Sequence, residues 1–348
     1  MCLTILTDLD GTLLPRPVGV GSAVVHPSLS DGPCHKPLVE LLDLGCTIVG
    51  VTGSRLATHQ TRFFEDLPLE HRRAGRVLLG VQTGSFLYKG SPADGSPVED
   101  LSFAESLEKQ NVRLTTDPSI VDGLIEVGRA GIRKFFADLA RDRSLVEVDS
   151  PLGYLLDCSA DEIPVTNDNH FVPRIEVREG NSAVVFVGVP STLGADYFAV
   201  PEAAVPFVDG RPCGRACFDC VPRGVDKSLV VTHLLGADLL QPGRVVALGD
   251  QPAGNDEGLA RWHRSSVCDI PFVSVSERVD MVPSHLRDCH VTAASNAEGS
   301  ALVLAALAAV VREAKARGAA AGGEHTLLTM STPALRGLID QLNSAATA

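Results

Sequence analysis

The chain has 348 residues, of which 45% are hydrophobic and 21% charged, and this composition excludes a disordered or a fibrous protein. Its formal net charge is −13, and a surface of that sign repels nucleic acid and anionic lipid, so we expect neither as a partner. A phosphorylated substrate would be repelled as well unless the protein offers it a bound cation or a locally positive pocket.

Cysteine usage and hydropathy predict where the protein works. The nine cysteines are odd in number and scattered, which indicates reduced thiols. Only six residues precede the Thr7-Asp8 pair, fewer than a signal peptide needs. The longest apolar run, Ala301 to Val311, has 11 residues, whereas a membrane span needs roughly 18. We therefore expect a cytoplasmic monomer or homodimer without a membrane segment.

Four short apolar segments, each followed by a polar cluster, predict buried strands: Leu3–Thr7, Cys46–Val51, Arg76–Val81 and Arg244–Leu248. Helical patterns separate several of them: Lys36–Leu44, Ser228–Leu235 and Ala301–Ala316. This alternation predicts an α/β fold, a Rossmann-like doubly wound parallel sheet with helices on both faces. In such sheets the chemistry lies beyond the carboxyl ends of the strands, where the polar clusters fall.

Residues 89–214 have a different pattern, which predicts an α+β cap domain inserted into a core of residues 1–88 and 215–317. A helix is expected over Ser119–Arg141. It precedes two alternating segments, Val172–Arg178 and Ser182–Val189, whose separation by Glu179-Gly180-Asn181 predicts a hairpin. For residues 318–348 we expect a flexible joint, the Gly-rich stretch 318–323, and a helix over Pro333–Asn343.

The strongest chemical signal is the pair Asp8 and Asp10 after the first strand. One oxygen of Asp8 can attack phosphorus while the other binds a cation. Asp10 can protonate the leaving alcohol and later deprotonate water. Gly11 permits the sharp exit that this arrangement needs. The alternative is an ordinary polar turn, because Asp-Gly pairs are common in turns.

A second cluster, Thr52-Gly53-Ser54, follows the second strand. The Thr52 hydroxyl can bind a phosphoryl oxygen, and the backbone N–H groups of Gly53 and Ser54 at a helix start form a natural anion site. By itself, this cluster is more simply interpreted as a helix N-cap.

Two further residues complete the predicted site. Lys227, just before an apolar helix, can neutralise charge on Asp8 and on the phosphoryl group. Asp250, after the fourth strand, can form a Mg²⁺ site with Asp8 and the backbone carbonyl of Asp10. A surface lysine and an acidic loop are the ordinary alternatives. Four such clusters in this order favour one shared site.

With these motifs the chain resembles the haloacid dehalogenase superfamily: DLDGTL at 8–13, VTGS at 51–54, Lys227 in GVDKS, and GDQPAGND at 249–256. The segment QTGSFLY at 82–88, and Val291-Thr292 followed by NAEG at 296–299, resemble the subgroup with a large α/β cap, including its closing strand and the start of its last helix. The resemblance implies Asp8 as nucleophile, Asp10 as general acid and base, Mg²⁺ as cofactor, and a small phosphorylated substrate. Subgroup members include sucrose-phosphate, trehalose-phosphate and mannosylphosphoglycerate phosphatases, so a sugar phosphate, possibly of a disaccharide, is expected.

The chain also departs from the family pattern. Four residues separate Asp250 from Asn255, which leaves open whether Asn255 and Asp256 touch the metal or support Lys227. The segment 218–227 and the lengthened last motif resemble phosphomannomutases, so a phosphosugar mutase is the alternative function.

Two features of the inserted segment carry less weight. Arg174, Glu176 and Arg178 would share one face of a strand, where the arginines could contact a sugar or a second anionic group, although a solvated face is the simpler interpretation. A cysteine cluster, Cys213-x3-Cys217-x2-Cys220, suggests a metal site. We expect none, because Cys217 and Cys220 on one strand would point to opposite faces.

Overall fold

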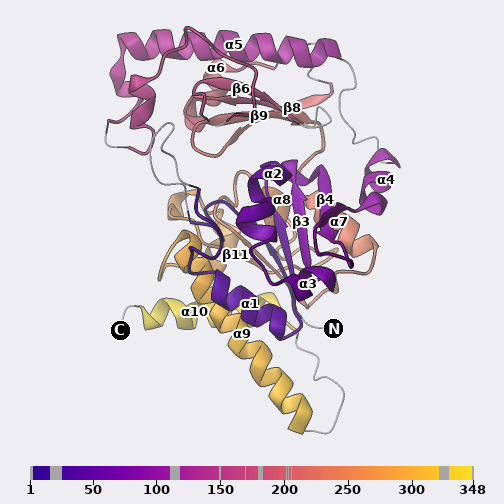
Figure 1. Cartoon of the computed structure of the whole chain (residues 1–348). Helices are drawn as coiled ribbons and strands as arrows, with labels where there is room; N and C mark the ends of the chain where they lie inside the picture. The colour runs from indigo at the N-terminus through magenta and orange to yellow at the C-terminus, as the bar shows by residue number, and fades with distance from the viewer. Residues whose placement is uncertain are drawn as a thin grey trace. The chain divides into compact units, whose positions relative to one another are not determined.

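The protein is described here by a computed structural model, which places residues 3–15, 26–109, 118–148, 150–168, 170–178, 183–200, 202, 204, 206–320 and 329–346. Its contacts divide the chain into two compact units (Figure 1). Among the described residues, the first unit holds 3–15, 26–104 and 226–346, and the second holds residues between 105 and 225. None of the described helices has the length and apolar composition needed to cross a bilayer.

The first unit is built on a seven-stranded sheet in the order β11-β10-β1-β2-β3-β4-β5. Its strands are β1 (Thr4–Thr7), β2 (Thr47–Val51), β3 (Val77–Val81), β4 (Phe86–Gly90), β5 (Pro97–Glu99), β10 (Val245–Gly249) and β11 (Phe272–Ser274). The first five in spatial order are parallel, and β4 and β5 add an antiparallel edge. Because β2 and β3 extend the sheet on one side of β1 while β10 and β11 extend it on the other, the predicted doubly wound fold class is confirmed.

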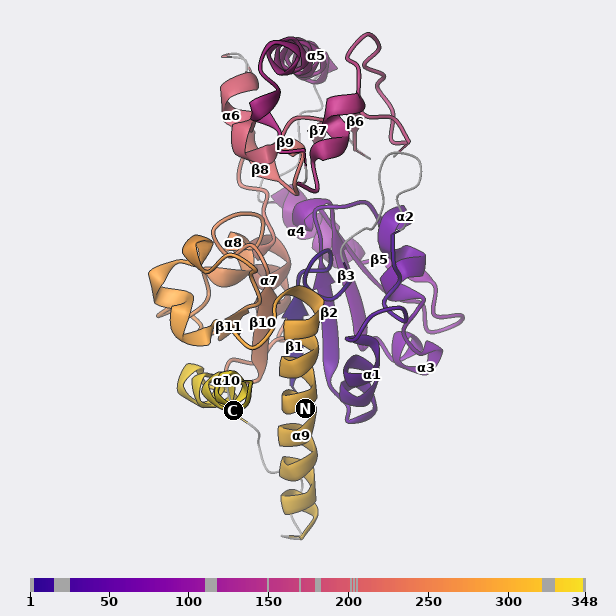
Figure 2. The same ribbon diagram turned by 90° about the vertical axis from the view of Figure 1, so that its left-hand side faces the viewer.

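Helices cover both faces of this sheet: α1 (His35–Asp43), α2 (Leu56–His59), α3 (Leu69–Arg73), α4 (Leu101–Lys109), α7 (Ser228–Gly236), α8 (Glu257–Ala260), α9 (Asn296–Ala320) and α10 (Thr332–Ala345). On one face, Ile5 and Ile48 belong to the same buried cluster as residues of α1, α9 and α10 (Figure 2). On the other face Val230 of α7 lies so close to β3 that a Cβ at Gly80 would approach it within 2.9 Å.

Short helical turns complete the connections. They are a π-helical turn η2 (Gln60–Phe64) and 3₁₀ turns η3 (Gln82–Gly84), η4 (Arg143–Leu145), η5 (Gly153–Asp157), η7 (Ser191–Leu193), η8 (Val279–Met281) and η9 (Ser284–Cys289). Of these, η2 and η3 lie next to the carboxyl ends of β2 and β3 and shape the candidate site.

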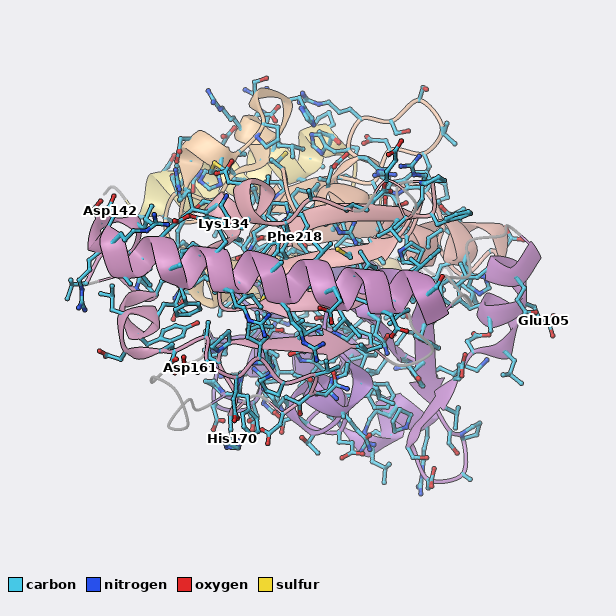
Figure 3. The ribbon with its side chains drawn as sticks, turned by 90° about the horizontal axis from the view of Figure 1, so that it is seen from above. Glu105, Lys134, Asp142, Asp161, His170 and Phe218 are labelled. Atoms are coloured by element: carbon cyan, nitrogen blue, oxygen red, sulfur yellow. The ribbon has the colours of Figure 1, made fainter. Side chains whose placement is uncertain are left out.

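The second unit is an antiparallel sheet in the order β6-β7-β9-β8, with β6 (Arg174–Val177), β7 (Val184–Val187), β8 (Val208–Cys213) and β9 (Cys217–Pro222). Helix α5 (Pro118–Arg141) runs across one face of it, as Figure 3 shows from above, and α6 (Gly194–Tyr197) lies beside it. Phe186 of β7 packs so tightly against α5 that a Cβ at Gly128 would lie 2.5 Å from its ring. The predicted α+β character and the β6–β7 pairing are confirmed, while the predicted turn residues 179–181 lie outside the described residues.

Side chains alternate between the two faces of this second sheet. Cys220 belongs to the buried cluster beneath α5, whereas Cys217 packs with Val185 and Val187 on the opposite face. The two thiols thus point apart, as the sequence predicts, and cannot ligate one metal ion together. The face opposite α5, called here the open face, also carries Glu176, Asp219 and Arg211 in register across the strands.

Three boundaries differ from the sequence predictions. Residues 89–104 belong to the first unit because β4 and β5 continue its sheet, and residues 215–225 belong to the second because β9 is a strand of that sheet. The predicted joint is partly wrong, since α9 continues through Gly318 to Ala320, and the rest of it lies outside the described residues. The closing strand predicted at Val291-Thr292 is reduced to a single bridge between His290 and Ser274.

Candidate active site

The site residues lie where three neighbouring strands end. Thr7, the last residue of β1, pairs with Leu248 of β10 on one side and with Gly50 of β2 on the other. Asp8 therefore emerges beside the residues that follow β10 and β2. This is the point at which the strand order reverses, where doubly wound sheets form a crevice for ligands.

A buried lysine joins two of these loops. The Lys227 ammonium is fully buried, donates a hydrogen bond to Oδ1 of Asp8, and lies 2.7 Å from Oδ1 of Asp256. The Thr12 hydroxyl donates to the other oxygen of Asp8 at 3.2 Å, and the N–H of Gln251 donates to the other oxygen of Asp256 at 2.9 Å. A buried ammonium needs such carboxylate partners, because an unpaired charge in the interior is very costly.

Two glycines make room for this arrangement. A Cβ at Gly249 would lie 2.5 Å from Oδ2 of Asp256, and one at Gly258 would lie 2.8 Å from the backbone nitrogen of Ser228. The first glycine lets the Asp256 carboxylate reach Lys227. The second lets α8 pack against the start of α7, where Lys227 is located.

The charges of this cluster shift its pKa values. Burial raises the pKa of Asp8 well above its usual range; Lys227 opposes this rise, and Asp256 and Asp250 add to it. Burial lowers the pKa of Lys227, but Asp256 and Asp8 outweigh burial and raise it, so the ammonium stays charged. Lys227 thus stays charged beside the carboxylates of Asp8 and Asp256.

Three neighbouring carboxylates make this cluster a candidate cation site. Asp8, Asp250 and Asp256 each offer a carboxylate oxygen, and these three atoms lie within 4.8 Å of one another. Three oxygen donors suit a hard divalent cation such as Mg²⁺ better than zinc or copper. Asp256 already binds Lys227 and the N–H of Gln251, so its principal contacts are with the protein.

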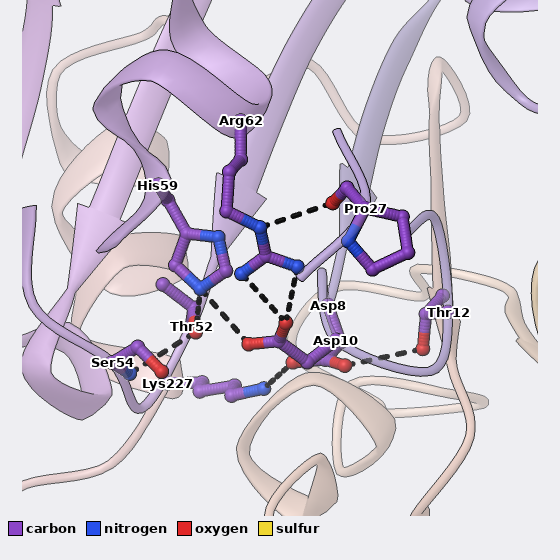
Figure 4. Close-up of polar contacts among 9 residues, drawn as sticks. All are labelled: Asp8, Asp10, Thr12, Pro27, Thr52, Ser54, His59, Arg62 and Lys227. Carbon is purple, nitrogen blue, oxygen red and sulfur yellow. Dashed lines mark hydrogen bonds and ion pairs between the residues drawn. The ribbon is translucent and has the colours of Figure 1, made fainter. Parts of the chain in front are cut away.

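Asp10 is held from a different side (Figure 4). Nε2 of His59 lies 2.9 Å from Oδ2 of Asp10, and both terminal nitrogens of Arg62 lie 3.4 Å from Oδ1. Burial raises the pKa of Asp10, but His59 and then Arg62 outweigh it and hold that pKa well below its usual range. The turn after Asp10 uses Gly11 at φ 87°, a left-handed conformation that favours glycine.

The second predicted cluster lies next to this pair. The Thr52 hydroxyl accepts a hydrogen bond from the N–H of Ser54 at 3.1 Å and lies 3.3 Å from Nε2 of His59. A Cβ built on Gly53 would lie 3.7 Å from the side-chain nitrogen of Asn255, so Asn255 borders the Thr52 loop. Helix α2 begins two residues after Ser54, at Leu56.

The loop after β3 is strained and supports the Thr52 loop. Gln82 and Thr83 have positive φ angles of 51° and 60°, which non-glycine residues seldom adopt. Their N–H groups donate to the carbonyls of Ser54 at 2.8 Å and Thr52 at 2.9 Å. Strain of this kind clusters at functional sites. Here it holds the loop that carries Thr52.

Arg174 and Arg178 do not belong to this cluster; they lie in the second unit and share one partner. Nε of Arg174 lies 2.9 Å from Oε1 of Glu176, and Nη2 of Arg178 lies 2.9 Å from Oε2. Glu176 is only 3% exposed. The solvated face suggested by the alternation is therefore wrong for this triad, which is a buried ion-pair network.

A second group of potential metal ligands, His263, Asp288 and Cys289, lies elsewhere in the first unit. Nδ1 of His263 accepts the N–H of Phe272 at 3.0 Å, so the proton of the neutral imidazole is on Nε2. Metal-binding histidines instead donate their second nitrogen's proton to a neighbour. This group therefore does not fit a metal site.

The sequence missed three residues of the site: Thr12, His59 and Arg62. Thr12 is part of the DLDGT segment, where only the carboxylates and the glycine were given roles. His59 and Arg62 stand three residues apart just after the Thr52 cluster, a spacing that puts side chains on one face of a helical turn. That spacing was the available signal, but nothing in it indicates Asp10 as the partner.

No family model matches the sequence, and the search of curated proteins found no match. Solved structures are similar in part. The IMP-bound IMP-nucleotidase of Plasmodium falciparum is 11% identical, with a TM-score of 0.46 over 90% of this chain and 68% of that one. The sucrose-phosphatase of Synechocystis is 15% identical, with a TM-score of 0.45 over 87% and 96%. SMU.1108c from Streptococcus mutans is 14% identical, with a TM-score of 0.45 over 91% and 100%. Function is therefore inferred from this chain's own side chains.

Proposed function

We propose that this protein is a Mg²⁺-dependent phosphatase that hydrolyses a phosphomonoester through an aspartyl-phosphate on Asp8. The observation that carries the proposal is the buried contact between the Asp8 carboxylate and the Lys227 ammonium, beside the carboxylates of Asp250 and Asp256. A nucleophile, an opposite charge and a cation site at one sheet edge are the parts that phosphoryl transfer needs.

The residues divide the chemistry as follows. An oxygen of Asp8 attacks phosphorus while Lys227 offsets charge on the phosphoryl oxygens. Asp10 gives a proton to the leaving oxygen and then takes one from the water that breaks the intermediate. The Thr52 hydroxyl and the N–H groups of Gly53 and Ser54 hold the phosphoryl group. Asp256 keeps Lys227 in place.

Mg²⁺ would be held by Asp8, Asp250 and the backbone carbonyl of Asp10. When bound, it supplies positive charge that neutralises the phosphoryl oxygens. The protein's part is to present oxygen donors and to keep Lys227 charged. The three carboxylate oxygens of Asp8, Asp250 and Asp256, which lie within 4.8 Å of one another, support the assignment.

For the substrate we propose a sugar phosphate, with the second unit as the part that selects it. Arg174 and Arg178 are the candidate contacts there, since guanidinium groups can bind anionic groups through two parallel hydrogen bonds. A phosphosugar mutase is the alternative. Four residues separate Asp250 from Asn255, and this lengthened last motif resembles that of phosphomannomutases.

The test is a screen of phosphate release from sugar phosphates with Mg²⁺, run beside the Asp8→Asn variant. We expect the variant to lose essentially all turnover, and EDTA to abolish parent activity until Mg²⁺ is restored. Turnover of Asp8→Asn near the parent level would refute the nucleophile. An absolute requirement for a sugar bisphosphate activator would favour the mutase.

A further inference from the structure

Both oxygens of the Asp10 carboxylate are occupied by side chains from one turn of the chain. Oδ2 faces Nε2 of His59 at 2.9 Å, and Oδ1 faces both terminal nitrogens of Arg62 at 3.4 Å (Figure 4). His59 is the last residue of α2, and Arg62 lies in the π-helical turn η2 that follows. Isolated π-helical turns are rare and are frequent at functional sites.

This turn is anchored on its other side. Phe63 and Phe64 are fully buried in the core of the first unit. The Phe63 ring touches β2 so closely that a Cβ at Gly50 would lie 2.9 Å from it. Nε of Arg62 donates to the carbonyl of Pro27 at 3.0 Å. The two donors to Asp10 therefore stand on a support that is fixed independently of Asp10.

The tautomer of His59 follows from its neighbours. Nε2 faces a carboxylate oxygen, which in its ionised form only accepts, so Nε2 carries a proton. Within the described part of the chain, the buried Nδ1 has no hydrogen-bond partner. Nε2 also lies 3.3 Å from the Thr52 hydroxyl, so one imidazole connects the phosphate-binding loop to Asp10.

We propose that His59 and Arg62 are positioning residues that orient the Asp10 carboxylate for hydrolysis of the aspartyl-phosphate. The inference rests on the proposed phosphatase function. In that step a water proton passes to Asp10, the water oxygen bonds to phosphorus, and the bond from phosphorus to Asp8 breaks. Inorganic phosphate leaves, and Asp10 then holds the proton that it gives to the next leaving oxygen.

Orientation matters more in this second step than in the first. During formation of the intermediate, the leaving oxygen is covalently attached to a phosphorus that Lys227 and the Thr52 loop already hold. During hydrolysis the nucleophile is a free water molecule, which the carboxylate of Asp10 has to place as well as deprotonate. A carboxylate free to rotate would therefore slow hydrolysis most, because misplacement by about 1 Å can cost about 100-fold in rate.

The test compares His59→Leu with His59→Gln. Leucine removes the N–H that faces Asp10, whereas the amide nitrogen of glutamine can replace it. For His59→Leu we expect kcat and KM to fall together by about 10- to 100-fold, with kcat/KM within about threefold of the parent, because slower hydrolysis leaves the first step intact. The phosphoenzyme trapped by acid quench should rise. His59→Gln should recover most of kcat.

His71→Leu is the matched control. Nε2 of His71 lies 2.8 Å from Oδ1 of Asp43, a similar histidine–carboxylate contact away from the site, so its loss should leave kcat and KM unchanged. If His59→Leu does not fold, Arg62→Met is the second variant. The Arg62 side chain is 11% exposed, whereas that of His59 is fully buried, so the change at Arg62 disturbs the core less. We expect it to show the same joint fall of kcat and KM.

The outcomes separate this inference from the proposed function. A fall in kcat/KM as large as that in kcat, an unchanged kcat, or equal loss in His59→Gln and His59→Leu would overturn the positioning role. An inactive parent, or an Asp8→Asn variant as active as the parent, would instead overturn the phosphatase itself.

Discussion

The site of the first unit and the open face of the second are both buried charge networks, but they are built differently. At the site the charges come from loops after parallel strands and from the start of α7, so residues as distant in sequence as Asp8 and Lys227 meet. On the open face they come from alternate positions of neighbouring strands, and Glu176 and Asp219 lie in one register row. Loops can vary in chemistry around a fixed sheet, whereas a strand face is tied to its pleat.

The two networks also differ in which charge is shared. At the site one ammonium, that of Lys227, contacts two carboxylates, Asp8 and Asp256. On the open face one carboxylate, that of Glu176, contacts two guanidinium groups, Arg174 and Arg178. A lysine is thus the common partner in one network and a glutamate in the other.

The largest effect should come from Lys227→Met. Removing the ammonium leaves the Asp8 and Asp256 carboxylates buried without their common partner, which typically costs about 3–5 kcal/mol of unfolding free energy. Turnover should also disappear, since the charge on the phosphoryl oxygens is no longer offset. Denaturant unfolding and phosphate release measure the two effects.

The control for that variant is Lys89→Met. Lys89 is half exposed and lies 3.3 Å from Asp100, a buried carboxylate that also accepts hydrogen bonds from Ser102, so the loss of Lys89 should change stability by less than about 1 kcal/mol. Similar losses for both lysines would contradict the distinction between a fully buried and a half-exposed lysine.

Glu176→Gln tests the open face. It removes the carboxylate that Arg174 and Arg178 share, and we expect a loss of about 2–3 kcal/mol, because glutamine keeps one acceptor but no charge. The matched control on the same sheet is Asp209→Asn, whose exposed carboxylate lies 3.3 Å from Arg223 and should matter little. Equal effects would mean that the open face is no buried network.

Gly249→Ala should have a smaller effect. The added methyl group meets the Asp256 carboxylate, which must shift and loosen its contact with Lys227, at a cost of about 1 kcal/mol. Gly337→Ala in α10 is the contrasting variant, since nothing lies within 4 Å of the new Cβ and alanine favours a helix. Unfolding midpoints should move in opposite directions, and a parallel shift would count against crowding at Gly249.

The smallest effect concerns pH. Burial raises the pKa of Asp219, against the influence of Arg178, Cys213 and Arg211. A raised folded-state pKa stabilises the protein at low pH, and this contribution is lost as pH rises from 3.8 through the folded value. Relative to the parent, Asp219→Asn should therefore gain stability as pH rises from about 4 to about 8. Denaturant unfolding at each pH measures this gain.

Asp142 provides the opposite sign. Hydrogen bonds from Ser144 lower the pKa of Asp142, so its contribution to stability is complete above the unfolded value of 3.8 and is lost as pH falls through the lower folded value. Relative to the parent, Asp142→Asn should lose stability as pH rises toward about 4, and the difference should stay constant above about pH 5. A difference that instead grows as pH falls below about 4 would contradict the assigned direction.

The sequence predicted the sheet well because its strands are continuous apolar runs ending in polar clusters. The four predicted strands appear as β1, β2, β3 and β10, whereas β4, β5 and the three-residue β11 were not predicted. The role of the β4–β5 hairpin was also missed, because an antiparallel edge has no signal of its own in a segment that leads into an insertion. Local patterns show where strands lie more clearly than where a domain ends.

At the site, the sequence identified the residues whose types are tied to chemistry and missed those defined by contact. Asp8, Lys227 and Asp256 follow strands or begin helices in a recognisable order. His59 and Arg62 depend on a π-helical turn and on the rotamer of Asp10, and neither can be read from a pattern of residue types. The sharing of Lys227 between two carboxylates likewise depends on how the loops meet in three dimensions.

The most direct measurement is to quench the enzyme with acid during turnover of a sugar phosphate and to map the phosphorylated residue by mass spectrometry. We predict one phosphoryl group, on the peptide that contains Asp8, absent from Asp8→Asn and more abundant in His59→Leu. A phosphoryl group on another residue, or turnover without any phosphoenzyme in either the parent or His59→Leu, would contradict the account.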